Sequence, residues 1–245
     1  DDYYTNLKTS LSSESGPVVF TLNSDAEITE VKDYLADLSG LTFVGGELVG
    51  EILSRLVLYM LKKYPALDPE RVYITGYSMG GMASYCCLFE HPELYAAAVP
   101  MAMPLFDVPA GAAEKFKGLE MPLKICSSTY DFAAWDPEKG HINDGAQLLF
   151  RTYQGFNGMK VPEEFDFEKY PFVGQSTDSM EITTINGEWR NFQWLMNGPK
   201  GYPLMGLNVT EYLVHSLWPG YGDLAWDFFR HYRRDAKTGE IIYTE

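Results

Sequence analysis

The chain has 245 residues, of which 46% are hydrophobic, so it is long enough and apolar enough to bury the core of one sizeable domain. Its 19 basic and 34 acidic residues give a formal net charge of −15, which repels nucleic-acid phosphates and anionic lipid surfaces. The longest apolar stretch, residues 94–106, contains two prolines and is shorter than the roughly 20 apolar residues of a membrane-spanning helix. We therefore expect one soluble domain, residues 1–245, that binds neither nucleic acid nor membranes.

The N-terminal part of the chain is predicted to alternate strands and helices. Residues 1–4 contain neither an initiator methionine nor a basic region before an apolar one, so no signal peptide is visible and we expect a processed or excised chain. Residues 17–22 are typical of a strand and residues 24–38 of a polar-faced helix. Between residues 47 and 63, apolar side chains recur every four positions, which predicts a helix packed by one face. Residues 72–75 (VYIT) predict a short buried strand.

The middle of the chain continues this alternation. Residues 82–90 predict a helix that the proline at position 92 stops, and residues 96–102 and 123–128 predict two further buried strands. Three cysteines, at positions 86, 87 and 126, show neither a CxxC nor a metal-type spacing. We expect free thiols and no metal site, with a disulfide between the third cysteine and one of the first two as the alternative.

Residues 132–201 do not continue the alternation of strands and helices, and we expect them to form an insertion or cap. Within them the sequence predicts a helix at 146–153 and a hairpin at 189–204. A strand at 207–214 follows, and then an amphipathic helix whose apolar face comprises Leu224, Ala225, Phe228, Phe229 and Tyr232. Strands separated by helices predict an α/β protein with a mostly parallel central sheet flanked by helices.

The segment Gly76-Tyr77-Ser78-Met79-Gly80 has the pattern G-x-S-x-G between a predicted strand and a predicted helix. Glycines on either side allow a tight, strained turn that lifts the serine hydroxyl above the sheet edge at the start of the helix. The context makes this segment more specific than the bare pattern, because glycine and serine are common in ordinary loops. We expect Ser78 to be a nucleophile and the backbone amide of Met79 to be one oxyanion donor.

A nucleophilic serine needs a histidine base, and the chain has only four histidines. His91 precedes a proline at a helix end and is expected to cap it, whereas His231 lies between arginines in the last helix. His141 comes too early in the chain to be the base but could contact substrate. His215 directly follows the last predicted strand, where the base of this architecture belongs.

The expected order in the chain is serine, then acid, then histidine. Asp131 lies on the loop that leaves the strand at 123–128, and active sites of parallel sheets lie at that end of the strands. Asp136 and Asp144 are the rival acids, of which Asp144 is better explained as a helix N-cap. The second oxyanion donor has no clear source in the sequence; the turn at Gly45-Gly46 is a weak candidate.

The run DPERVYITGYSMGGMAS at residues 68–84 resembles the polyhydroxybutyrate-depolymerase-like and feruloyl-esterase-like branch of the α/β-hydrolase superfamily. Thr129-x-Asp131 is similar to the acid loop of that branch. The segment HSLWPG at 215–220 resembles its His-x-Trp-Pro-Gly motif with one extra residue, Leu217. The resemblance covers residues 47–131 and 202–243.

This resemblance implies hydrolysis of carboxyl esters without a cofactor, on small-molecule or on polymer- or polysaccharide-linked esters, by a secreted or periplasmic protein. Fewer strands precede Ser78 than in that branch, so we expect truncated or rebuilt N-terminal strands. Tyr77, Trp135, His141 and Trp218 are the expected substrate contacts. A peptidase or acyltransferase using the same three residues, and a non-catalytic binding module that kept the fold, remain the alternatives.

Overall fold

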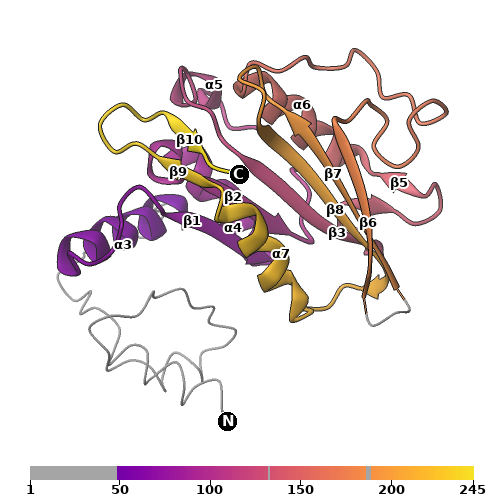
Figure 1. The fold of residues 1–245 in the computed structure, drawn as a ribbon, viewed down its shortest axis with the longest axis horizontal. Helices are drawn as coiled ribbons and strands as arrows, with labels where there is room; N and C mark the ends of the chain where they lie inside the picture. Colours follow the sequence, from indigo (N-terminus) through magenta and orange to yellow (C-terminus); the bar gives the residue numbers. More distant parts are fainter. Residues whose placement is uncertain (1–48, 132, 186–188) are drawn as a thin grey trace, which may run out of the picture.

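The computed structural model describes residues 49–131, 133–185 and 189–245 (Figure 1). The strand predicted at 17–22, the helix predicted at 24–38 and the turn at Gly45-Gly46 lie outside the described residues. Among the residues that the structure describes, no helix is both long enough and apolar enough to cross a membrane.

The central sheet has the strand order β1-β2-β3-β8-β7-β6. Its parallel part comprises β1 (Tyr73–Tyr77), β2 (Ala97–Met101), β3 (Leu123–Tyr130) and β8 (Pro203–Val214). The antiparallel strands β7 (Trp189–Asn197) and β6 (Ser179–Ile185) extend it at one side. The prediction of a mostly parallel α/β sheet is confirmed.

Helices cover both faces of this sheet (Figure 1). One face packs against α4 (Met79–Glu90) and α6 (Asp144–Phe156), with α3 (Val49–Lys63) lying against α4. The other face packs against α7 (Gly220–Phe229). Successive residues of β2 point to opposite faces of the sheet. Ala98 belongs to the core on the side of α4 and α6, and Val99 belongs to the core on the side of α7. A strand buried on both faces explains why the sequence from 96 to 102 is apolar at nearly every position.

The smaller elements lie in the connections. They are a 3-10 turn, η1 (Pro92–Leu94), the short helix α5 (Ala112–Lys115), and two hairpins, β4 (Trp135–Asp136) with β5 (His141–Ile142) and β9 (Tyr232–Arg234) with β10 (Ile241–Tyr243). The prediction that Tyr232 belongs to the last helix is wrong. The chain leaves α7 at Phe229, and Tyr232 begins β9, where pairing with β10 outweighs helical periodicity.

The segment 132–201 differs from the expected cap, because part of it belongs to the central sheet. β7 pairs with β8, and β6, which the sequence analysis missed, pairs with β7. The hairpin predicted at 189–204 is formed by β7 and the start of one long strand, β8, that runs through residue 214. Residues 179–184 of β6 are exposed on both faces, although Met180 and Ile182 alternate with polar residues as in a half-buried strand.

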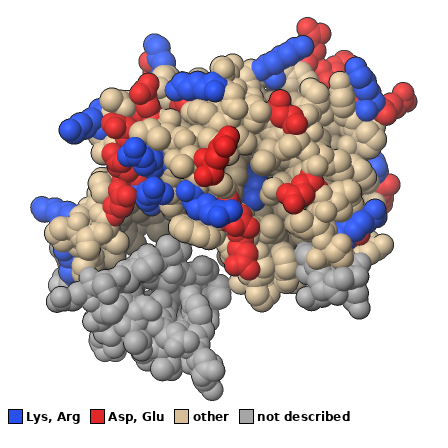
Figure 2. All heavy atoms as spheres, viewed as in Figure 1, with Lys and Arg blue, Asp and Glu red and all other residues tan. Residues whose placement is uncertain are grey.

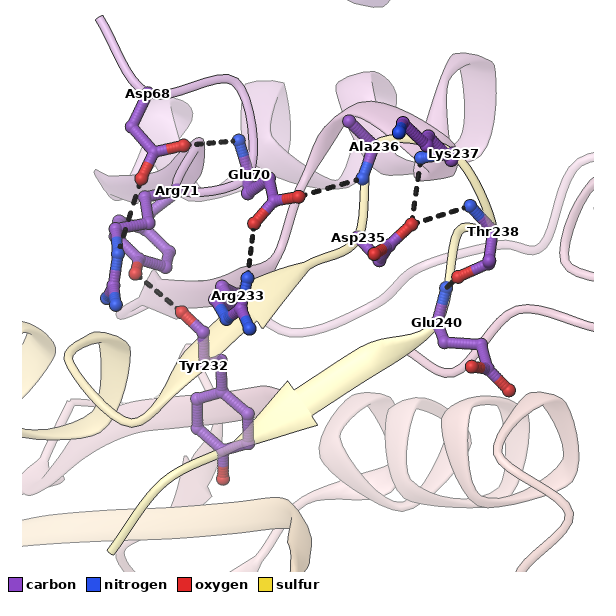
Figure 3. Close-up of polar contacts among 11 residues, drawn as sticks. Asp68, Glu70, Arg71, Tyr232, Arg233, Asp235, Ala236, Lys237, Thr238 and Glu240 are labelled. Carbon is purple, nitrogen blue, oxygen red and sulfur yellow. Dashed lines mark hydrogen bonds and ion pairs between the residues drawn. The ribbon is translucent and has the colours of Figure 1, made fainter.

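The C-terminal hairpin is tied to the loop that precedes β1 (Figure 3). Glu70 accepts hydrogen bonds from the Arg233 side chain and from the Ala236 backbone N–H. The Tyr73 hydroxyl donates to the backbone carbonyl of Tyr232 at 2.6 Å. Residues 232–236 thereby hold the strand that leads to Ser78.

Candidate active site

The loop between β1 and α4 presents Ser78 in a strained conformation. β1 continues through Gly76 to Tyr77, two residues beyond the predicted strand, and Ser78 has φ 55° and ψ −118°. A φ in this range is uncommon for a residue with a side chain and costs of order 1–3 kcal/mol. The Ser78 backbone N–H donates to the carbonyl of Met101 at 3.0 Å, which fixes the turn against β2.

The two glycines of the G-x-S-x-G pattern have different roles in this turn. A Cβ at Gly76 would lie 2.3 Å from the backbone of Gly80, so the turn closes only because position 76 has no side chain. A Cβ at Gly80 would meet nothing within 4 Å. The expectation that both positions must be small therefore holds for Gly76 alone.

Asp131 lies directly after β3, and its side chain is fully buried. Its Oδ1 accepts a hydrogen bond from the Ala133 backbone N–H at 2.9 Å. The rival acids are engaged elsewhere. Asp136 accepts backbone N–H groups of the turn that follows it, and Asp144 is the first residue of α6. The N-cap of α6 is Asn143, not Asp144 as expected.

His215 follows β8 and joins the other two side chains. Its Nδ1 lies 3.1 Å and 3.0 Å from the two carboxylate oxygens of Asp131, and its Nε2 lies 2.8 Å from the Ser78 Oγ. A carboxylate partner assigns the proton to Nδ1, so that Nε2 is the nitrogen that can accept the serine proton. The structure thus brings together Ser78, Asp131 and His215, from the ends of three parallel strands.

A bulge at the end of β8 sets the position of His215, and no pattern of residues predicted this bulge. Ser128 pairs with Thr210, but Tyr130 pairs with Val214, so β8 advances four residues while β3 advances two. Within the bulge, Tyr212 has φ 59°, and its backbone N–H donates to Thr129 Oγ1 at 2.9 Å. Bulges re-aim the residues beside them, and this one fixes the end of β8 next to the acid loop.

The Tyr77 side chain lies beside the imidazole. Its ring centroid is 5.0 Å from that of His215 and 6.0 Å from that of Tyr221, which in turn contacts Trp218 edge-on at 5.6 Å. Burial, and then the charge of Asp131, raise the pKa of Tyr77 to about 12, so the phenol stays neutral at physiological pH. Trp218 is half-buried, and only a glycine at position 220 leaves room for its ring. Tyr77 therefore contacts the imidazole directly and Trp218 is connected to it only through Tyr221, and the contact of these two rings with substrate stays a prediction.

Trp135 and His141 are the expected substrate contacts that are near Asp131 in sequence. In the structure both rings stack on phenylalanine side chains. The Trp135 side chain is 3% exposed and stacks on Phe172 with ring centroids 5.9 Å apart. The His141 ring stacks on Phe167 at 3.7 Å, and its Nδ1 lies 2.8 Å from the carbonyl of Ile142. The β4–β5 hairpin packs on the core through Trp135 and Ile142, and the contact of Trp135 and His141 with substrate stays a prediction.

The remaining residues considered for the site are Met79, the other two histidines and the cysteines. Met79 is the first residue of α4, so its backbone N–H has no acceptor within its own helix, and its side chain is 74% exposed. His91 caps the C-terminus of α4, and His231 contacts the carbonyl of Thr244 at 2.7 Å. In the described ranges, no group of three His, Cys, Asp or Glu side chains could hold a metal ion, and the three cysteines are free.

A parallel sheet, a strand–serine–helix turn at its carboxyl edge, and an acid and a histidine after later strands in that order define the α/β-hydrolase fold. The chain has this fold, and its site has the Ser-His-Asp arrangement of a serine hydrolase.

Comparison with known proteins gives partial matches. A model described as the prolyl oligopeptidase family matches residues 53–115. Among solved structures, an acetyl xylan esterase from Aspergillus awamori is 16% identical over 74% of this chain and 66% of that chain, with a TM-score of 0.49. A structure titled as a thermostable esterase is 23% identical over 50% of this chain and 30% of that chain, with a TM-score of 0.32. This chain thus spans less than two thirds of either esterase, and no curated protein matches it.

Proposed function

We propose that the protein is a serine carboxyl-ester hydrolase in which Ser78 is the nucleophile, His215 the general base and Asp131 the acid that orients it. The observation that carries this proposal is the chain of contacts from Asp131 through His215 to Ser78 Oγ, at 3.0 Å and 2.8 Å. These distances lie within the reach that proton transfer needs.

In the proposed reaction, His215 Nε2 takes the proton of Ser78 as Oγ attacks the ester carbonyl carbon. Asp131 stabilises the imidazolium that forms, and the Met79 backbone N–H donates to the developing oxyanion. His215 then returns the proton to the leaving alcohol, and an acyl-enzyme remains. Water, activated by the same histidine, hydrolyses the acyl-enzyme and regenerates Ser78.

We further propose that the substrates are neutral esters, either small molecules or groups linked to a polymer or polysaccharide. The net charge of −15 opposes the approach of polyanions. The polymer-linked class rests on the resemblance of residues 68–84 and 215–220 to esterases of that kind.

The proposed activity is tested with p-nitrophenyl acetate. Ser78→Ala should lower kcat by at least about 10⁴-fold, because without the serine hydroxyl only the oxyanion donor and binding remain. Ser176→Ala, which alters an exposed serine in the loop before β6, should leave kcat unchanged. A fluorophosphonate probe should label wild-type protein on Ser78, whereas a non-catalytic module would not react. Activity that survives Ser78→Ala would overturn the proposal.

A peptidase is the second candidate, because the matched family model over residues 53–115 is that of the prolyl oligopeptidase family. The same three side chains would attack an amide, with His215 protonating the leaving amine. Parallel assays of a proline-containing peptide p-nitroanilide and of p-nitrophenyl acetate discriminate the two. Faster turnover of the anilide would replace the ester hydrolase with the peptidase.

A further inference from the structure

The strand β6 forms one edge of the central sheet and has no strand on its outer side among the described residues. It lies at the opposite end of the sheet from β1 and pairs with β7 alone (Figure 1). Because the backbone N–H and C=O groups along the outer side of an edge strand face no other strand of the sheet, they can pair with a strand of a second molecule.

The sequence of β6 lacks the features that usually protect an edge strand from such pairing. Its seven residues, SMEITTI, contain neither proline nor lysine, and Glu181 is the single charged residue among them. All seven pair with β7 in one continuous register, without a bulge that would turn the edge away. An uninterrupted strand with this composition is a template for the addition of another strand.

Apolar side chains continue the core of the sheet as far as this edge. Ile182 lies opposite Phe192 of β7, and Phe192 lies opposite Val209 of β8. Phe192 and Val209 belong to the core on the side of α4 and α6, whereas Ile182 is 52% exposed. Met180, opposite the buried Trp194, is 49% exposed on the same face. The row of core side chains therefore ends in apolar surface that one further strand would cover.

A second copy of this chain fits the edge in one antiparallel register. A two-fold axis perpendicular to the sheet keeps each residue on its own face, so the axis must lie between two copies of the same residue. An axis at Glu181 would set two carboxylates against each other, and an axis at Thr183 would set Met180 beyond the end of the strand. An axis at Ile182 sets Ile182 against its copy, Glu181 against Thr183 and Met180 against Thr184.

We propose that β6 pairs with β6 of a second copy about a two-fold axis between the two Ile182 side chains, so that a homodimer shares one continuous sheet. The apolar row then runs from Val209 and Phe192 of one copy, through both Ile182 side chains, to the same residues of the other. Like charges stay out of opposite positions, because Glu181 faces a threonine. Strand pairing alone buries little surface, so the dimer is weak, with a Kd of about 10–100 µM.

Sedimentation velocity of the full chain tests the dimer. Salt at about 0.15 M screens the net charge of −15 that each copy carries. The wild type should be mostly monomeric at about 1 µM and mostly dimeric at about 300 µM, as the proposed Kd requires. Ile182→Lys sets two ammonium groups against each other at the axis and should raise the Kd at least about tenfold. A wild type that is monomeric at the higher concentration would overturn the proposal.

Thr183→Lys tests the register through a gain of affinity, which a misfolded variant would not show. In the proposed register each new lysine faces Glu181 of the partner subunit, twice in the symmetric interface, so the Kd should fall about fivefold. The matched control is Leu58→Lys, which adds the same charge at a leucine that is 46% exposed on α3 and should change the Kd less than about twofold. A Thr183→Lys Kd no lower than that of the control, or an Ile182→Lys dimer as tight as the wild type, would refute this pairing.

Discussion

Gly76 and Gly80 flank Ser78 symmetrically in sequence but not in space. The backbone of Gly80 occupies the volume that a side chain at position 76 would need, whereas position 80 faces open space within α4. The strained φ of Ser78 is held by this close approach together with the hydrogen bond to Met101. The conformation of Ser78 thus depends on the absence of a side chain at position 76.

The first prediction follows from this asymmetry. Gly76→Ala should lower the free energy of unfolding by about 2 kcal/mol, because an added carbon forces backbone apart in a packed turn. It should also lower kcat on p-nitrophenyl acetate. Gly80→Ala should change stability by less than about 1 kcal/mol, toward stabilisation, since alanine favours the helix. Urea unfolding of both variants checks the pair, and equal losses would contradict the assignment.

At the scale of elements, α3 and α4 are joined at both backbone and side chains. A Cβ at Gly50 would lie 2.3 Å from the carbonyl oxygen of Cys86, so the two helices approach as closely as backbones allow. At the end of α4, His91 contacts Glu51 of α3 and Glu93, each at 2.9 Å. Burial lowers the pKa of His91, but the hydrogen bonds with Glu93 and Glu51 outweigh it, so the pKa is raised overall.

A raised pKa in the folded state gives a stability that depends on pH in a defined direction. The contribution of His91 is fully present below the unfolded value of about 6.5 and is lost as pH rises through the folded pKa. His91→Gln should therefore destabilise the protein at pH 5.5, by less than about 1 kcal/mol because the group is partly solvated, and have no effect at pH 9. Thermal unfolding across this range measures it, and Glu51→Gln should reproduce part of the trend. A loss independent of pH would refute the ion-pair explanation.

At the scale of the whole molecule, a buried arginine joins the C-terminal hairpin to the sheet. Arg234, in β9, is 3% exposed and donates to the backbone carbonyls of Tyr95, Glu120 and Gly239 at 2.9, 2.7 and 2.6 Å. Burial lowers the pKa of Arg234 to about 10, which still leaves the side chain charged at neutral pH.

On the surface, acidic and basic side chains are interspersed over the face in Figure 2.

Arg234→Lys tests this junction. One ammonium group cannot reach three carbonyls arranged for a planar guanidinium, so the variant should lose about 3 kcal/mol of unfolding free energy. Arg230→Lys is the matched control, because Arg230 is exposed and pairs with Asp227 at 3.6 Å; it should lose less than about 0.5 kcal/mol. Urea denaturation compares them, and similar losses would show that the three carbonyl bonds contribute little.

The sequence by itself determined those features that depend on local chemistry. A buried strand, a glycine and a serine before a helix predicted the turn at Ser78, and the strand ends before Asp131 and His215 placed both residues at one edge of a parallel sheet. Parallel strands make this inference reliable, because their carboxyl ends meet at one edge. The helix at 49–63 was predictable from the periodicity of its apolar residues. The strands β2 and β3 were predictable from their continuous apolar runs.

Only the tertiary structure decided the features that depend on pairing between distant segments. The bulge at Tyr212 lies in the pairing of β8 with β3, beyond Thr210, the last residue at this end of β8 that pairs with β7. Trp135 was expected at the site because it is near Asp131 in sequence, yet the β4–β5 hairpin buries it in the core. Proximity in space is set by long-range strand register, which no local pattern of residues encodes.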